Sequence, residues 1–417
     1  MFIKHRWPLS AVLLGASVVA LVAAPALSDP APPFSELLRQ AQSAPRLAES
    51  RSEIDQARGL AQQAATRPNP SVSLLVENFG GARSYDQLGG QTTLQIDQPL
   101  ELGGKRAARI AAGRAGVDAA QARFNQSVAD FGFDLASAYA EAEAAERRLD
   151  FAQETLGLAR DDAHVATALV KAGKEADLRV VQADTVVQAA RAGVEAARSA
   201  KEAAFGRLTA LAGTSAPITA IAVSLLAHAD RPETPPVPDP TASPVYVAAQ
   251  AARAAAARRV QVERTRAAPD VTLSLGARRL AGEKATALVG GVSVPFPIFD
   301  RNRGNISASL AELSGAEARL DAARLDAEAE SRSGVARARA ALARIAAARE
   351  GETTAEEGYR LSRIGYEGGK LPLIEVLNAR RALAEARAQT LDARLERLGA
   401  EAALARLQGV APFGDQP

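Results

Sequence analysis

The chain has 417 residues, no cysteine and three histidines, and its 50 lysines and arginines nearly balance its 48 aspartates and glutamates. The formal net charge of +2 excludes the strongly basic surface that non-specific nucleic-acid binding requires, so we expect no nucleic-acid partner. Aromatic residues make up only 4% of the chain, whereas alanine is abundant. Both features favour long, closely packed helices over a compact globular core.

Residues 1–26 are predicted to be a signal peptide. Lys4 and Arg6 form a basic start, residues 9–22 are largely apolar, and Ala24-Pro25-Ala26 supplies small residues for cleavage. A retained N-terminal anchor is the alternative. Cleavage would remove two basic residues and leave 48 of each sign, for a net charge of zero. Without cysteine the exported chain can form no disulfide and carry no cysteine-linked lipid, so we expect no lipid anchor.

The first half of the mature chain, residues 27–216, is predicted to contain a helix, two strands, a long helix, a turn and a returning helix. Val72, Leu74 and Val76 alternate with more polar residues, and Leu94 and Ile96 do so again. Alternation with a period of two indicates short strands with one apolar face. Next comes a proline-free stretch from 104 to 171, which predicts a helix of about 100 Å. A glycine turn at 173 and a returning helix from about 177 complete this half.

The second half repeats this plan after a linker. Residues 217–244 are predicted to be the linker, because six prolines fall between 231 and 244. Residues 245–410 then form the second repeat, with strands near 271–276 and 286–294, a long helix over 302–366, and a returning helix from about 373. Residues 411–417 are left as a C-terminal tail.

An internal duplication is indicated by one fixed offset of 196 residues. Gly173-Lys174 recurs as Gly369-Lys370, and heptad positions downstream keep the same register. Small or apolar residues at two positions of each heptad are typical of a close-packed coiled coil. The matched seam positions of the first half are Val180, Val187, Val194, Ala183, Ala190 and Ala197, and those of the second are Val376, Leu383, Thr390, Ala379, Ala386 and Ala393.

Four strands per chain set a condition on any membrane-spanning form. Open sheet edges are not tolerated in lipid, and eight strands are the usual minimum for a closed barrel. If these strands span a membrane, copies of the chain must therefore share one barrel. Two copies would give eight strands and three copies would give twelve.

Several motifs resemble those of the TolC family of outer-membrane efflux proteins, and within it the CzcC-type branch associated with heavy-metal export. The resemblance covers nearly the whole mature chain. Its motifs are Arg67-Pro68-Asn69-Pro70, Glu77-Asn78, Gln98-Pro99-Leu100-Glu101-Leu102-Gly103-Gly104-Lys105-Arg106, Pro295-Phe296-Pro297-Ile298-Phe299-Asp300-Arg301-Asn302-Arg303-Gly304 and Gly368-Gly369-Lys370-Leu371-Pro372-Leu373-Ile374-Glu375-Val376-Leu377-Asn378-Ala379.

The resemblance implies a mainly α fold with a small β part, built from two repeats that each contain a β-hairpin and a long helical hairpin. It further implies a homotrimer in the outer membrane, with one shared twelve-stranded barrel and a helical tunnel in the periplasm. The implied partners are outer-membrane lipid, a periplasmic adaptor and an inner-membrane pump of the resistance-nodulation-division type. The implied cargo is heavy-metal cations. The same duct for drugs or secreted proteins remains an alternative, as does a periplasmic coiled-coil protein without a channel.

The resemblance also points to site residues at the helical turns. In the TolC family an acidic residue just past the second turn lines the closed periplasmic aperture, and Glu375 has that position here, with Asn378 one turn on. Three symmetry-related glutamates would form a ring that favours cations. Arg179 has the matching position in the first half and could pair with an acid across the helices. The alternative is that Glu375 and Arg179 are ordinary solvated positions.

Gly173, Lys174, Gly369 and Lys370 are expected at the exposed tips, where they turn the chain and could contact the adaptor. No catalytic or cofactor-binding pattern is present. His164 and His228 share no metal-ligand spacing, so we expect no metal site. Gly103-Gly104-Lys105 lacks the full phosphate-loop spacing and is read as a strand-to-helix bend. The sequence therefore predicts a protein that is not an enzyme.

Overall fold

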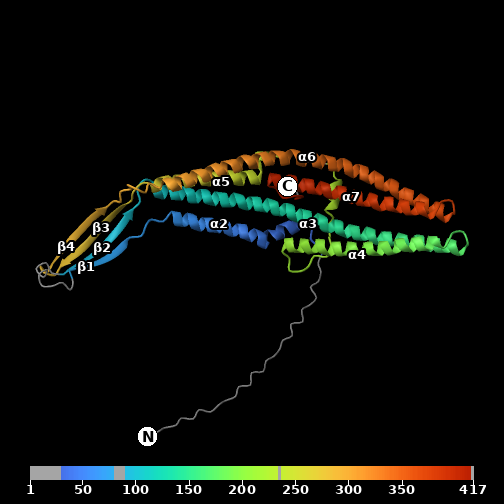
Figure 1. Ribbon diagram of the computed structural model, residues 1–417, viewed down its shortest axis with the longest axis horizontal. Helices are drawn as coiled ribbons and strands as arrows, with labels where there is room; N and C mark the ends of the chain where they lie inside the picture. Colours follow the sequence, from blue (N-terminus) through green and yellow to red (C-terminus); the bar gives the residue numbers. More distant parts are fainter. Residues whose placement is uncertain (1–29, 79–89, 233–235, 415–417) are drawn as a thin grey trace, which may run out of the picture.

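A computed structural model describes residues 30–78, 90–232 and 236–414 of the chain. The predicted signal peptide lies outside these residues. The described chain is elongated, with a β-sheet at one end and the turns of two helical hairpins at the other (Figure 1). No helix in the described ranges is both long and apolar enough to cross a bilayer.

The two halves follow the same order of elements, as the duplication predicts. The first half consists of α1 (Phe34–Gln40), the 3₁₀ helix η1 (Ala41–Ser43), α2 (Pro45–Ala64), β1 (Ser71–Glu77), β2 (Gln91–Leu100), α3 (Lys105–Lys171) and α4 (Leu178–Ala212). Two short 3₁₀ helices follow, η3 (Leu226–Asp230) and η4 (Pro240–Ala242). The second half consists of α5 (Pro244–Arg266), β3 (Val271–Leu280), β4 (Ala285–Ser293), α6 (Arg303–Glu367) and α7 (Leu373–Gln408).

The proline-rich connection differs slightly from its prediction as a segment without helix. Three of its residues form η4, and Pro244, placed in the linker by the sequence, is the first residue of α5. Proline is favoured at that position because its missing N–H would have no helical partner there. The Ser243 hydroxyl caps the same helix end by accepting a hydrogen bond from the Tyr246 backbone N–H at 3.2 Å.

The strands form one antiparallel sheet in the order β1-β2-β3-β4, so the two predicted hairpins lie side by side. Leu74 lies opposite Leu94, and Ile96 lies opposite Leu275. Since side chains alternate between faces, this register gathers the large apolar residues on one face. The other face carries Thr93, Asp97 and their partners, including a hydrogen bond that the Arg278 guanidinium donates to the Thr93 hydroxyl at 3.0 Å.

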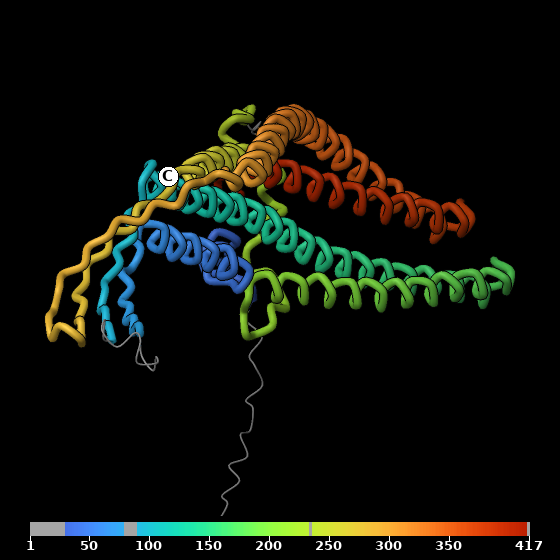
Figure 2. Tube along the Cα trace, turned by 60° about the vertical axis from the view of Figure 1, so that its left-hand side comes forward, coloured from blue at the N-terminus to red at the C-terminus, as the bar shows by residue number. Residues whose placement is uncertain are grey.

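The long helices begin where glycine or asparagine bends the chain out of the sheet. Gly104 precedes α3 with φ 78°, and Asn302 precedes α6 with φ 58°. The two helices then run for 67 and 65 residues without a proline, so each is about 100 Å long. This confirms the lengths predicted from the sequence. Each helix returns through a shorter partner, and Figure 2 shows both hairpins ending at the side of the molecule away from the strands.

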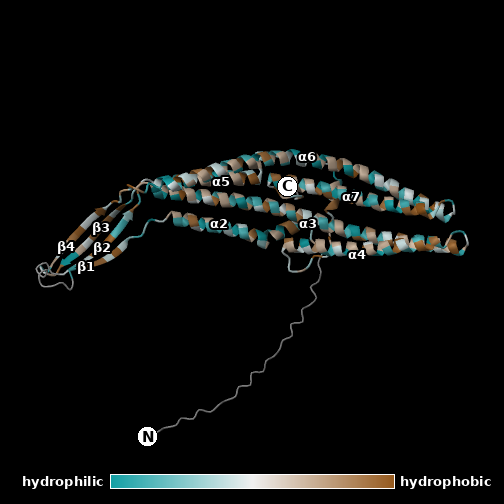
Figure 3. Cartoon of the chain, viewed as in Figure 1, coloured by the Kyte–Doolittle hydropathy of each residue, from teal (hydrophilic) through white to brown (hydrophobic). Residues whose placement is uncertain are grey.

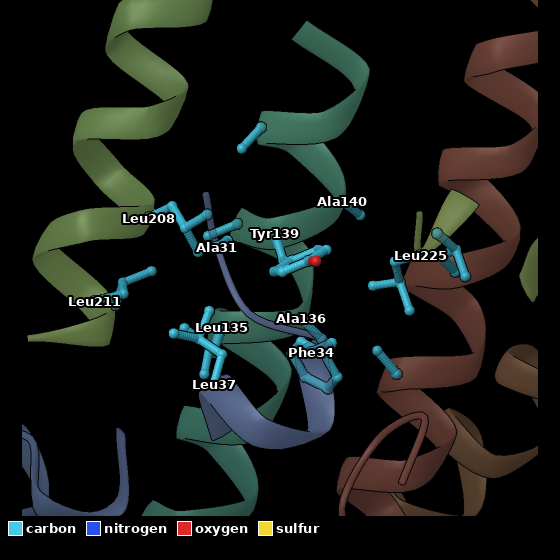
Figure 4. Close-up of a cluster of buried hydrophobic side chains, with 14 of the residues drawn as sticks. Ala31, Phe34, Leu37, Leu135, Ala136, Tyr139, Ala140, Leu208, Leu211 and Leu225 are labelled. Carbon is cyan, nitrogen blue, oxygen red and sulfur yellow. The ribbon is translucent and has the colours of Figure 1, made fainter. Parts of the chain in front are cut away.

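The main core lies halfway along the helices, where the N-terminal segment and the first part of the linker wrap around α3. Figure 4 shows Phe34 and Leu37 of α1 against Leu135 and Tyr139 of α3, with Leu225 approaching from the linker. The Tyr139 hydroxyl donates to the Val223 carbonyl at 2.9 Å. These contacts fasten the linker to the helices and belong to a larger buried cluster than the one near the helical turns.

Candidate functional site: the helical tips

Both helical hairpins turn with the same backbone hydrogen bonds. The Lys174 N–H donates to the Leu169 carbonyl at 3.0 Å, and the Lys370 N–H donates to the Gly365 carbonyl at 2.8 Å. Gly173 and Gly369 sit at the left-handed position of this motif, with φ values of 72° and 70°. The four tip residues predicted from the sequence therefore form two equivalent turns. Both lysines are exposed.

Glu375 lies in the first turn of α7, where the positive end of the helix dipole stabilises its negative charge. Its side chain and that of Asn378 are exposed in the single chain. The neighbouring residues Leu373 and Val376 are completely buried, so packing fixes which way this turn of the helix faces. Glu375 has no ion-pair partner among the described residues.

Arg179 makes its contacts within the first hairpin. Its guanidinium lies 3.4 Å from the Glu175 carboxylate, four residues earlier, and donates to the Gln182 side-chain oxygen at 3.0 Å. In the single chain Arg179 thus pairs with an acid of its own hairpin, and its pairing with an acid across the helices stays a prediction. Arg179 and Glu375 match in sequence register but make no described contact with each other.

A buried ion pair just inside the tips was not foreseen from the sequence. The Arg380 guanidinium on α7 lies 3.1 Å from the Asp162 carboxylate on α3, and these side chains are only 8% and 3% exposed. The Tyr359 hydroxyl of α6 donates to the same carboxylate at 3.4 Å. One acid thus ties the first hairpin to both helices of the second.

The electrostatics of this group follow from its burial. Desolvation raises the pKa of Asp162, and the nearby charge of Arg380 opposes that shift. Desolvation, with the negative charge of Asp162, also raises the pKa of Tyr359 to about 12. An ionised Asp162 would therefore destabilise the fold if Arg380 were not in contact with it.

Apolar packing surrounds the ion pair and joins the two tips. The packed residues come from all four long helices: Ala166, Ala183, Tyr359, Tyr366, Leu373, Val376 and Leu383. Several are seam positions of the predicted heptads. The seam was therefore visible in the sequence, but its packing across the two hairpins was not.

The two ends of the molecule differ in chemical character and lie far apart. One end presents apolar strands, the other presents two rigid helical turns, and about 100 Å of helix separates them. Within the described ranges, no group of three or more histidine, aspartate or glutamate side chains gathers as a metal site would. This architecture suits a long passive conduit.

Comparison with known proteins gives the family. The sequence profile described as "Outer membrane efflux protein" matches residues 37–214 and 243–410, and the chain belongs to this family. It is 42% identical over 405 residues to the nickel-cobalt-cadmium resistance protein NccC of Alcaligenes xylosoxydans xylosoxydans, covering 97% of this chain and 92% of that one. It is 30% identical to the cobalt-zinc-cadmium resistance protein CzcC of Cupriavidus metallidurans, covering 83% and 82%.

Solved structures confirm the fold. The outer membrane protein VceC of Vibrio cholerae superposes with a TM-score of 0.74 at 20% identity, covering 91% of this chain and 96% of that one. The expected TolC-like, two-repeat fold is thus confirmed, and so is the resemblance to the CzcC-type branch. The chain is an outer-membrane efflux component and not an enzyme, and proteins of its family work with a periplasmic adaptor and an inner-membrane pump.

Proposed function

We propose that three copies of this chain form a passive duct that exports heavy-metal cations across the periplasm and the outer membrane. The observation that carries this proposal is the sheet, whose two edge strands, β1 and β4, have no partner strand within the described chain. Free edges are not tolerated in lipid, so copies must join edge to edge. Three copies would close a barrel of twelve strands.

The proposed cargo rests on the relatives. NccC and CzcC are named for resistance to nickel, cobalt, cadmium and zinc, and this chain is similar to both in sequence over most of its length. Within the described ranges no cluster of three or more metal-ligating side chains is found, so we propose that the pump selects the metal. That pump would be of the resistance-nodulation-division type.

The proposed periplasmic gate is at the second tip. Three copies of Glu375 around the axis would form an acidic ring that attracts cations, with Asn378 one turn further in. Arg179, held by Glu175 in the first tip, would lie beside this ring without neutralising it. The exposed turns at Gly173-Lys174 and Gly369-Lys370 would dock on the adaptor.

The proposed organisation of the chain is a signal peptide over 1–26, repeats over 27–216 and 245–410, a linker between them, and a tail over 411–417. The family match to two separate ranges supports the division into repeats. We place the helices in the periplasm, the sheet in the outer membrane, and no lipid anchor on the chain.

Export is tested by deleting the gene and restoring it. Loss should lower the tolerance of the cells to nickel, cobalt and cadmium together, and the intact gene should restore it. Tolerance to dyes, detergents and antibiotics should be unchanged by the deletion. If drug tolerance falls while metal tolerance is unaffected, the metal proposal is wrong and the drug duct is right.

A further inference from the structure

The apolar face of the sheet is short. On β4 its large exposed residues are Leu288 and Val292, and on β2 they are Leu94, Ile96 and, at the end of the strand, Leu100. Brown segments on β1 and β4 in Figure 3 mark this apolar character. The four residues from Leu288 to Val292 rise about 13 Å and the six from Leu94 to Leu100 about 20 Å, and a tilt of about 40° reduces these rises to about 10 and 15 Å along the membrane normal. An outer-membrane barrel presents an apolar band about 25 Å tall, so the sheet alone is too short.

The apolar pattern continues beyond the sheet into both strand-to-helix connectors. After Val292 it runs through Val294, Phe296 and Ile298 at every second residue, and Phe299 follows. Phe296 is 82% exposed and Phe299 is 99% exposed in the single chain. These are unusual values for phenylalanine, since an aromatic ring in water forgoes a large hydrophobic gain.

The first half has the same feature at the same offset. Leu100, the last residue of β2, and Leu102 in the connector stand 196 residues before Phe296 and Ile298, and both are exposed. Gln98 is the one polar residue in this row between Leu94 and Leu102. Leu94 to Leu102 and Leu288 to Phe296 each span eight residues. Each rises about 26 Å along the strand, or about 20 Å along the normal, which comes close to the height of the apolar band.

The backbone of these connectors is suited to an apolar environment. Pro295 and Pro297 have no N–H to leave unsatisfied, and the Ile298 N–H donates to the Phe296 carbonyl at 2.9 Å. In the first half Pro99 likewise lacks a donor, and the Leu102 N–H donates to the Asp270 carboxylate at 3.3 Å. Chain that leaves a sheet inside lipid must satisfy its donors in this way.

Basic residues follow the apolar rows on the helical side. Arg301 and Arg303 are exposed and have no carboxylate partner among the ion pairs of the described residues. Lys105, at the matching offset from Arg301, pairs with Asp270 at 2.7 Å. Long basic side chains are favoured at this depth, because they reach the phosphates while their stems stay in apolar surroundings.

We propose that both strand-to-helix connectors lie in the periplasm-facing leaflet of the outer membrane and anchor the duct at a fixed depth. Leu100, Leu102, Phe296, Ile298 and Phe299 occupy the boundary between acyl chains and headgroups, and Arg301 and Arg303 bind phospholipid phosphates. The membrane thus ends at the helix starts and not at the last paired strand residue. This inference rests on the proposed function, because it needs the sheet in the membrane.

Single tryptophans test the depth directly. The one tryptophan of the sequence, Trp7, lies in the proposed signal peptide, so each introduced tryptophan is the only reporter in the mature chain. Phe296→Trp and Leu102→Trp report on the connectors, Leu288→Trp on the sheet, and Leu325→Trp on an exposed position of α6 far from the strands. Each purified assembly is reconstituted in phosphatidylcholine vesicles whose acyl chains carry bromine either near the headgroup or near the methyl end.

If the connectors lie at this depth, bromine near the headgroup should quench the Phe296→Trp and Leu102→Trp variants, and deeper bromine should quench the Leu288→Trp variant. The Leu325→Trp variant should keep its emission in both. If only the Leu288→Trp variant is quenched, the membrane ends at the sheet and the inference is overturned. Blue-shifted but unquenched emission at 296 would overturn it too, because a neighbouring copy would then cover the connector. An unquenched Leu288→Trp variant would contradict the proposed function itself.

Discussion

At the scale of single residues, Glu375 carries the gating hypothesis. It is exposed, lies at the start of α7 and is held in place by its buried neighbours Leu373 and Val376. Replacing Glu375 with alanine should raise ion leakage through the purified duct in planar bilayers and weaken its preference for cations. Glu385→Ala, an exposed glutamate further along α7, is the matched control and should change neither. Unchanged conductance and selectivity in the Glu375→Ala variant would remove this residue from the gate.

Arg380 is predicted to support the fold through Asp162. Arg380→Leu leaves a buried carboxylate without its cation, which should cost about 3 kcal/mol of stability near neutral pH. Arg381→Leu, at the exposed neighbouring position, should cost little. Thermal unfolding of the purified assembly measures both changes. Equal effects of the two substitutions would show that the buried pair contributes nothing.

The loss in the Arg380→Leu variant should also depend on pH. Burial already raises the pKa of Asp162, and removing Arg380 takes away the charge that opposes this shift, so the pKa in the folded variant rises further. An acid whose pKa is higher in the folded than in the unfolded chain destabilises the fold above that pKa, and this penalty disappears as the pH falls through it. The gap between variant and parent should therefore narrow from about pH 8 to about pH 5. A gap that stays constant over this range would contradict the role assigned to Asp162.

At the scale of elements, the turns should behave differently from the helices they join. Gly369 has φ 70° and no atom within 4 Å of an added Cβ, so Gly369→Ala is opposed by backbone conformation alone, at about 1 kcal/mol. Gly351 lies inside α6 with equally open surroundings, so Gly351→Ala should stabilise the protein by about 0.8 kcal/mol. Opposite shifts in the midpoint of thermal unfolding are expected. Shifts of the same sign would contradict the turn geometry.

At Gly276 the backbone of β2 leaves no room for a side chain on β3. A Cβ there would lie 2.5 Å from the Leu94 carbonyl oxygen. Gly276→Val should therefore weaken the pairing of the two hairpins and lower the stability of the protein by about 2 kcal/mol. Gly290→Val is the control, because the nearest atom to its Cβ is 3.9 Å away. The first variant should lose the slow-migrating band on an unboiled gel, and the second should keep it. Retention of the band in both would show that the two hairpins need not pair this closely.

Prediction from sequence succeeded where a local pattern decides the structure. The alternation around Leu94, the proline-free stretch before Lys171 and the glycine at 369 each act on nearby backbone, and the strands, the helix lengths and the turns agreed with them. It failed where the partner is distant in the sequence. Asp162 is one acid among many, and nothing near it indicates that Arg380, over two hundred residues later, would reach it.

At the scale of the whole molecule, contacts between copies are as hidden from a single chain as distant contacts are from the sequence. The exposed apolar face, the free edges of β1 and β4 and the exposed Glu375 are all unsatisfied features of a single chain. Each becomes reasonable when copies surround a common axis in a membrane. The fold could be predicted from the sequence, whereas the proposed site would be completed only by the proposed assembly.

The pairing of β1 with β4 between copies is the central claim, and the absence of cysteine makes it directly measurable. Because barrel closure staggers the strand register, a set of chains is needed, each with one cysteine on β1, at Val72, Leu74 or Val76, and one on β4, at Leu288 or Val292. Each can be treated in intact cells with a short bismaleimide. Within one chain these strands are three strand spacings apart, about 14 Å, so a shorter reagent should link only different copies. We expect bands of one, two and three linked chains on a denaturing gel and none larger. Unlinked single chains at every pair of positions, or a ladder that continues past three, would contradict the claim.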